Sequence, residues 1–202
     1  MKKLLLVMLL VPLLISCATM NDAQLDSTAT NIASYAKLSE ENAQIFKDTF
    51  IQCYKENKIE VFYDSLERCY YISPKGFKNT FAFFSFTIDS KGKIQNKLEG
   101  QYYDNDWLYV DKVVFYNSQY KWTKSNLYWS IKSDVKSNAY VTEEFSVLLK
   151  TSDATNLAKM VNDNYSIRFY GLYDDYETVY LTDKLRSSQQ AVVYLQMLLS
   201  AK

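Results

Sequence analysis

Strict alternation of side-chain character over residues 94–103 is the feature that most constrains how this chain folds. Neighbouring side chains of a β-strand point to opposite faces of a sheet, so a pattern of period two predicts a strand with one buried and one polar face. Just before this stretch, the sequence DSKGK at 89–93 predicts a hairpin turn, because Gly92 can adopt a positive φ angle. The two faces carry Ile94, Asn96, Leu98, Gly100 and Tyr102 on one side, and Gln95, Lys97, Glu99, Gln101 and Tyr103 on the other.

Similar β-rich runs fill much of the rest of the chain, and helical patterns flank them. The predicted strands are residues 59–63, 69–72, 81–88, 107–116, 127–131, 145–149, 165–171 and 177–182. The predicted helices span about residues 40–54, a short segment capped by Ser152 or Asp153, and a closing segment that begins at Thr182-Asp183. The fold class is therefore predicted as α+β: a mostly antiparallel sheet, curled or in two layers, with an N-terminal helix and one or two C-terminal helices.

The N-terminus is typical of a bacterial export signal. Lys2 and Lys3 precede residues 4–15, which are apolar except for the helix-disfavouring Pro12. This run is too short for a spanning helix, which needs about 20 apolar residues, and a charged start, a short apolar run and a small residue indicate a signal peptide. The sequence LISC, ending at Cys17, resembles the bacterial lipobox.

The lipobox resemblance implies cleavage before Cys17 and attachment of a diacylglyceryl group to its sulfur, so that the membrane is a partner through this lipid. Two or three acyl chains anchor a protein durably, whereas one chain binds only marginally. The expected location is the bacterial cell envelope. Ala18 follows the cysteine where an Asp is the familiar inner-membrane signal in enteric bacteria, so the outer membrane, on its periplasmic or surface face, is expected if the source has two membranes.

Small polar residues follow Cys17 as far as about residue 34, with few large apolar groups to bury. The predicted organisation is a signal peptide at 1–16, a lipidated N-terminus with a flexible tether at 17–38, and a single α+β domain at 39–202. Loss of Lys2 and Lys3 with the signal peptide changes the formal charge from 0 to about −2. Nothing in this charge favours a nucleic-acid partner.

The complete absence of histidine excludes several chemistries. Without imidazole there is no Ser-His-Asp or Cys-His pair, and no zinc site of the common His-containing kinds. We predict no catalytic residue, no cofactor and no metal site, and whether the chain is an enzyme stays open, with a non-enzymatic role favoured.

Cys53 and Cys69 would both be exported into an oxidising compartment, where pairs of thiols commonly form a disulfide. Each also has aromatic neighbours, and a buried cysteine often serves as a small apolar residue. The sequence leaves these two interpretations open.

Acidic residues cluster in two places: Asp104 with Asp106, and Asp174-Asp175 with Glu177. Turns favour Asp because its side chain binds nearby backbone groups, and this is the preferred interpretation. The alternatives are a glycosidase pair, with two carboxyl groups about 5–9.5 Å apart, or a site for a hard cation.

Arg168 stands in the middle of an apolar predicted strand. If Arg168 alternates outward, with Ile167 and Phe169 inward, it is solvated or paired with a carboxylate such as Asp106 or Asp174. The structural pair is the preferred interpretation, and the alternative is bidentate recognition of an anionic ligand.

Two segments resemble an uncharacterised family of β-rich domains from exported bacterial proteins. They are DNDWLYVDKVVFY at 104–116 and IRFYGLYDDYETV at 167–179, and the closing helix follows them. The resemblance implies a β-rich exported domain and carries over no catalytic residue. The matching positions are Asp106, Trp107, Leu108, Arg168, Phe169, Gly171, Tyr173 and Asp174.

Aromatic residues are abundant, with 18 Tyr, 11 Phe and 3 Trp. Exposed rings on a sheet suit the binding of sugars, peptides or proteins, whereas buried rings fill a core, and Tyr102, Tyr103, Tyr109 and Tyr116 are expected to divide between the two roles. The first hypothesis is thus a membrane-anchored, non-enzymatic lipoprotein that binds a protein or envelope polymer through an aromatic face. The alternatives are a carboxylate-dependent hydrolase of envelope glycans and a structural subunit of an envelope assembly.

Overall fold

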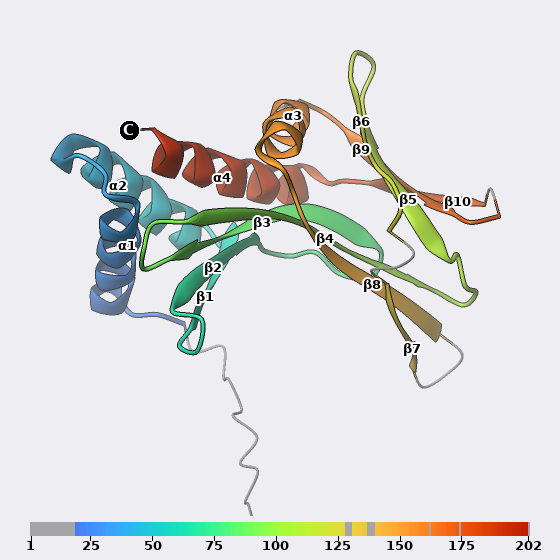
Figure 1. Ribbon diagram of the computed structural model, residues 1–202, viewed down its shortest axis with the longest axis horizontal. Coiled ribbons are helices and arrows are strands. Elements are labelled where there is room, and N and C mark those ends of the chain that lie inside the picture. The colour runs from blue at the N-terminus through green and yellow to red at the C-terminus, as the bar shows by residue number, and fades with distance from the viewer. Residues whose placement is uncertain (1–18, 128–130, 137–139, 162, 174, 202) are drawn as a thin grey trace, which may run out of the picture.

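The computed structural model describes residues 19–127, 131–136, 140–161, 163–173 and 175–201. These residues form four helices and two antiparallel sheets, of six and four strands (Figure 1). The predicted α+β class, with a mostly antiparallel sheet and helices at both ends of the chain, is confirmed.

The larger sheet, sheet A, has the strand order β1-β2-β3-β4-β8-β7. The first four strands follow one another along the chain, and β8 then pairs with β4. The strands are β1 (Ile59–Asp64), β2 (Cys69–Pro74), β3 (Phe81–Asp89), β4 (Ile94–Asp104), β7 (Lys132–Lys136) and β8 (Tyr140–Leu148). The predicted turn at 89–93 joins β3 to β4, with Gly92 at a φ of 82°.

The smaller sheet, sheet B, has the order β10-β9-β5-β6 and stands beside sheet A in Figure 1. Its central strands, β5 and β9, lie within the segments 104–116 and 167–179. The strands are β5 (Val110–Tyr116), β6 (Lys121–Lys124), β9 (Ser166–Gly171) and β10 (Tyr176–Tyr180).

Three of the four described helices cover one face of sheet A, and α3 lies beside α4 toward sheet B (Figure 1). No described helix covers the opposite face, which we call the open face of sheet A. The helices are α1 (Asp22–Ala36), α2 (Glu40–Lys55), α3 (Thr151–Val161) and α4 (Asp183–Ser200). Helices α2 and α4 begin directly after Ser39 and Thr182, whose side chains cap them by accepting backbone N–H bonds.

The alternation predicted for β4 sets the two faces of sheet A. Leu98 is opposite Phe84 in the register and both are buried beneath the helices, while Glu99 is opposite Phe83 on the open face. The hydrophobic core is therefore formed by every second residue of the central strands together with the apolar stripes of the helices.

The buried side chain of Gln189, on α4, forms hydrogen bonds with backbone groups of β3 that have no partner on β2. Strand β2 pairs with β3 only as far as the pair Ile72 and Phe86. Beyond this point, the backbone N–H of Phe84 donates to Gln189 Oε1 at 2.9 Å, and Gln189 Nε2 donates to the Phe84 carbonyl at 3.1 Å. The amide thus satisfies two buried backbone groups that would otherwise lack partners.

The predicted flexible tether at 17–38 is wrong for residues 22–36, which form α1. Asn21 and Gln24 form a reciprocal capping box at its N-terminus. The helix buries two large side chains and three alanines in the main core: Leu25, Ile32, Ala29, Ala33 and Ala36. The prediction failed because it counted only large apolar groups, whereas alanine at helical spacing also makes a buried stripe.

Two smaller expectations also differ from the structure. Leu127 and Ile131 lie outside strands, and β6 and β7 flank them instead. Ser152 and Asp153 lie within the first turn of α3 instead of capping it.

Candidate functional site

The outer face of sheet B gathers most of the exposed tyrosines of this sheet. Alternation along β5, β9 and β10 turns one set of side chains outward, while Val113, Phe115, Ile167 and Phe169 point into the core. Tyr176 is 59% exposed and Tyr180 is 76% exposed. We call this surface the tyrosine face and define it as Lys112, Tyr116, Arg168, Tyr170, Tyr176 and Tyr180.

Arg168 occupies the centre of the tyrosine face. Its guanidinium carbon lies 5.2 Å from the ring centroid of Tyr116 and 4.6 Å from that of Tyr176, so aromatic rings flank the cation. Its Nε donates to Thr178 Oγ1 at 2.9 Å, and its two terminal nitrogens donate to the hydroxyls of Tyr170 and Tyr116 at 3.4 and 3.3 Å. These contacts raise the pKa of the guanidinium, with the hydrogen bond to Tyr170 as the largest cause.

The preferred interpretation of Arg168 as an ion-pair partner of Asp106 is wrong. Every hydrogen-bond acceptor of Arg168 among the described residues is a neutral hydroxyl, and no described carboxylate forms an ion pair with it. Asp174, the other partner considered, lies outside the described residues. The positive charge is therefore not neutralised by any described acid.

Val114 shows that the outer side chains form a packed layer. It faces outward opposite Arg168 in the register, yet only 3% of its surface is exposed, although it lies outside the main core cluster. Arginine and tyrosine bury their apolar stems and rings while their polar ends stay in water. The tyrosine face is thus partly ordered before any ligand binds.

Trp107, Tyr109 and Tyr173 form a second aromatic cluster at the β9–β10 end of sheet B. The rings of Trp107 and Tyr109 are stacked at 6.1 Å, and Tyr173 meets Tyr109 edge-on at 5.8 Å. This cluster brings together the segments 104–116 and 167–179. Leu172 donates its N–H to the Tyr109 carbonyl at 3.1 Å, and a Cβ at Gly171 would lie 2.0 Å from the Leu108 carbonyl oxygen.

Of the predicted acidic residues, Asp104 and Glu177 both lie close enough to Tyr102 to act on its hydroxyl, while Asp174 lies outside the described residues. Asp106 and Asp175 are exposed, and Asp104 accepts the N–H of Asn105 at 2.6 Å and the hydroxyl of Tyr102 at 3.4 Å. Burial and the nearby Asp104 carboxylate raise the pKa of Tyr102. Within the described part of the chain, no group of three or more Cys, Asp or Glu residues could hold a metal ion.

A trough of about 520 Å³ on the open face of sheet A is lined by other acidic residues. Two of their carboxylates accept backbone hydrogen bonds within turns. Asp64 accepts the backbone N–H groups of Leu66 and Glu67, and Asp89 accepts those of Lys91 and Lys93. The bond from Lys93 is the largest cause of the lowered pKa of Asp89. These carboxylates therefore shape the β1–β2 and β3–β4 turns.

Glu99 forms a hydroxyl network on the same open face. It accepts hydrogen bonds from Tyr71, from Ser85 at 2.9 Å and from Ser146 at 3.1 Å. Burial is the largest cause of the raised pKa of Tyr71, followed by the charge of Glu99. Because three hydroxyls share one carboxylate, the network resembles a structural polar cluster more than a pair of catalytic acids of the kind that a glycosidase needs.

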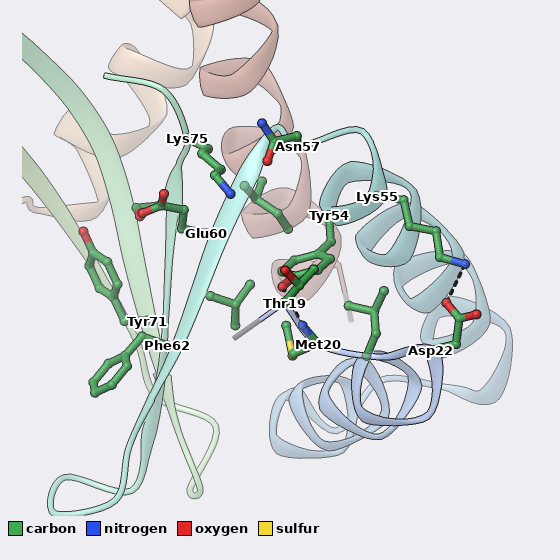
Figure 2. A pocket seen from close by; sticks show the side chains of 14 residues that line it. Thr19, Met20, Asp22, Tyr54, Lys55, Asn57, Glu60, Phe62, Tyr71 and Lys75 are labelled. Carbon is green, nitrogen blue, oxygen red and sulfur yellow. Dashed lines mark hydrogen bonds and ion pairs between the residues drawn. The ribbon is translucent and has the colours of Figure 1, made fainter. Parts of the chain in front are cut away.

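A second cavity of about 520 Å³ runs between edge strand β1 and helices α1 and α2 (Figure 2). Thr19 and Met20 line it where the described chain begins, and the Met20 N–H donates to the Tyr54 hydroxyl at 3.1 Å. An ion pair of 2.8 Å between Lys55 and Asp22 joins the two helices at its side. The cavity wall is mixed, with Ile59 and Val61 among the apolar residues and Glu60 and Lys75 among the charged ones.

Cys53 and Cys69 are both free thiols, so the structure contains no disulfide between them. Cys53 lies on α2 in the core, on the helix-covered side of sheet A, whereas Cys69 lines the trough on the open face. The sheet separates the two residues, which explains why they do not pair. The predicted lipidation site, Cys17, lies outside the described residues.

Sequence reasoning missed Lys112, Tyr170, Tyr176 and Tyr180 as members of one surface. A period-two reading of YSIRFYG and YETVY contained the signal, because it places these tyrosines on the same face as Arg168. Of the four tyrosines considered from sequence, Tyr102 is buried, Tyr103 and Tyr116 are half-buried, and Tyr109 is exposed.

No protein-family model, no curated protein and no solved structure matches this chain. The resemblance to exported β-rich domains therefore stays a prediction. Among the described helices, none is both long and apolar enough to cross a membrane.

Proposed function

We propose that the protein is a lipid-anchored bacterial envelope protein that binds a ligand without catalysis, through the tyrosine face of sheet B. The observation that carries this proposal is the exposed layer of tyrosines around Arg168, a cation without an ion-pair partner among the described acids. Tyrosine gives wide apolar contact area at low cost in conformational entropy and also a polar hydroxyl, which favours it at recognition surfaces.

The alternative function, a carboxylate-dependent hydrolase of envelope glycans, has less support. Such an enzyme needs two carboxyl groups that face a common cleft. The acids of the trough on sheet A bind turn backbone instead, and Asp104 and Asp106 are not among the residues that line the two cavities of about 520 Å³.

The position of α1 adds a consequence for anchoring at Cys17. The helix begins directly after Asn21, so the four residue-to-residue steps from Cys17 to Asn21 span at most about 14 Å, at about 3.6 Å per step. A lipid on Cys17 would then hold the folded domain close to the membrane surface, with the cavity of Figure 2 on the membrane side.

Metabolic labelling tests the anchor. Cells that express the full chain are grown with an alkyne-tagged palmitate, and the tag is read on the purified protein. We expect label on the wild type and on Cys69→Ala, which is the matched cysteine control, and none on Cys17→Ala. Equal labelling of all three proteins, or of none, would contradict anchoring at Cys17.

Crosslinking in intact cells tests the ligand surface. A photoreactive amino acid at position 180 is expected to form adducts with envelope material, because Tyr180 is exposed on the tyrosine face. The same group at position 194, an exposed tyrosine on α4, is the control. Adducts of the same mass and yield at both positions would contradict a specific binding role for sheet B.

A further inference from the structure

We propose that the ligand of the tyrosine face is an acidic polysaccharide, with a uronate carboxylate bound to Arg168 and sugar rings packed on the neighbouring tyrosines. This inference rests on the proposed function, because it names the ligand class of the same surface. It goes further by assigning a charge and a chemical role to individual side chains.

Charge complementarity is the first argument. Arg168 and Lys112 are the two cations of the face, and neither has an ion-pair partner among the described residues. The Lys112 ammonium lies 4.2 Å from the centroid of the Tyr170 ring, so it is held on the same surface. A ligand with well-spaced negative charges would neutralise both.

The hydrogen bonds around Arg168 are the second argument. A guanidinium carries five N–H donors, and the three bonds to Thr178, Tyr170 and Tyr116 leave two of them for a ligand. The hydroxyls of Tyr170 and Tyr116 accept from Arg168, which leaves their own O–H groups free to donate. Arginine and two polarised hydroxyls together provide a convergent set of donors for a carboxylate.

The shape of the surface favours a sugar over a peptide. Extended peptides usually bind at the edge of a sheet, where they gain backbone hydrogen bonds, or in grooves. The tyrosine face lies instead on the flat side of β5, β9 and β10, away from the outer edge of β10, where sheet B ends. The exposed rings of Tyr176 and Tyr180 offer flat apolar platforms that suit the C–H faces of sugar rings.

The low density of positive charge on the tyrosine face argues against a strongly anionic polymer as its ligand. Nucleic acids and highly sulfated chains pair with dense patches of Lys and Arg. The tyrosine face has only two cations among four tyrosines, which favours a polymer of moderate negative charge.

Direct binding measurements test the proposal. The full lipidated chain is purified in a nonionic detergent and titrated with polygalacturonate, with dextran as the neutral glycan and poly-glutamate as the acidic peptide. We expect binding to polygalacturonate and none to dextran. Arg168→Gln is expected to weaken this binding by about tenfold or more, because a hydrogen bond to a charged group is lost. Lys91→Gln removes the same charge from an exposed turn of sheet A and is expected to change nothing.

Two further variants keep the test decisive. Arg168→Lys retains the charge but not the planar fork, so we expect it to bind more weakly than wild type and more tightly than Arg168→Gln. Tyr176→Ala removes an exposed ring and is expected to weaken binding to polygalacturonate while thermal stability stays near that of wild type. Thermal unfolding of each variant separates a lost site from a lost fold, and Tyr176→Ala remains informative if Arg168→Gln does not fold.

The outcomes distinguish this inference from the proposed function. Equal affinity of wild type, Arg168→Gln and Tyr176→Ala for polygalacturonate, or no binding at all, would overturn the inference. Tighter binding of poly-glutamate, again dependent on Arg168, would replace the glycan with an acidic peptide. Loss of lipid labelling at Cys17 would refute the anchor alone, and loss of envelope adducts at position 180 would refute the binding role of the face.

Discussion

The carboxylate of Glu143, on β8 of sheet A, accepts the backbone N–H of Tyr109, in the segment that leads into β5 of sheet B, at 2.8 Å. The same carboxylate also accepts the N–H groups of Leu108 at 2.8 Å and Val110 at 2.7 Å. Glu143 is only 1% exposed, and Tyr109 has a φ of 54°, which non-glycine residues rarely adopt. The buried side chain of Glu143 thus holds the backbone of residues 108–110, where the chain passes from sheet A to sheet B.

Glu143→Gln is expected to destabilise the protein by about 1–3 kcal/mol, because the new amide N–H group faces a backbone N–H that has lost its acceptor. Urea unfolding followed by tryptophan fluorescence measures this loss. Glu144→Gln, on the exposed neighbour in the same strand, is the control and is expected to stay within about 0.5 kcal/mol of wild type. Equal stability of the two variants would show that Glu143 does not hold the backbone of residues 108–110.

Gly171→Ala is expected to destabilise the protein by about 2 kcal/mol or more, because its Cβ would collide with backbone and not with a mobile side chain. The Leu108 carbonyl oxygen would lie 2.0 Å from this Cβ. Since Leu108 precedes Tyr109, we also expect the fluorescence of the stacked Trp107 to change. Leu172→Ala, at the exposed next position, is the control for stability. A normal unfolding midpoint for Gly171→Ala would contradict the close approach.

Local patterns in the sequence predicted α2, α3, α4 and most strands, but not α1, because those elements depend on spacing within a single segment. The apolar spacing of α2 and the alternation at 94–103 are examples. Pairings across the chain were not predictable in the same way. Glu143 is an unremarkable acid in the sequence VTEEF, and only the tertiary fold brings it to the backbone of residues 108–110.

The residues of the tyrosine face also differ in how far the sequence predicted them. Arg168 stands out in the sequence as a charge within an apolar strand, and its alternation with Ile167 and Phe169 predicted that it faces outward. Its neighbours Tyr116 and Tyr176 come from other strands, and their positions depend on the registers of β5 and β10 with β9. The expected ion pair with Asp106 failed for this reason, since a register cannot be derived from one strand alone.

Gln189→Leu is expected to cost about 2–4 kcal/mol, although leucine is apolar and of similar size. The substitution removes both hydrogen bonds to Phe84 and leaves a buried backbone N–H and C=O without partners. Gln52→Leu, at an exposed position of α2, is the control and is expected to be nearly neutral. Chemical denaturation of both variants provides the comparison. A neutral Gln189→Leu would mean that β2 closes onto β3 without help from α4.

The two cysteines are expected to react as free thiols of different accessibility. Without reductant, iodoacetamide should label Cys69 in the folded protein and Cys53 only after unfolding, because Cys53 is buried in the core. Burial is the largest cause of the raised pKa of both thiols. A raised pKa means less thiolate at neutral pH, so labelling of Cys69 should be slow at pH 7 and faster at pH 9. Peptide mass spectrometry reads the sites, and a peptide pair linked by a disulfide would contradict the prediction.

Helix α1 is expected to be an essential part of the domain, and not a removable linker. Ile32 is fully buried and Leu25 nearly so, and both belong to the same core cluster as the strands of sheet A. Ile32→Ala and Leu25→Ala should each lower the free energy of unfolding by about 2–5 kcal/mol, because each leaves a cavity in a packed core. Thr30→Ala, on the exposed side of the same helix, should cost much less. A flexible tether would make all three variants equally stable, so the difference between the core-facing and exposed positions decides whether the domain begins near residue 22 or near residue 39.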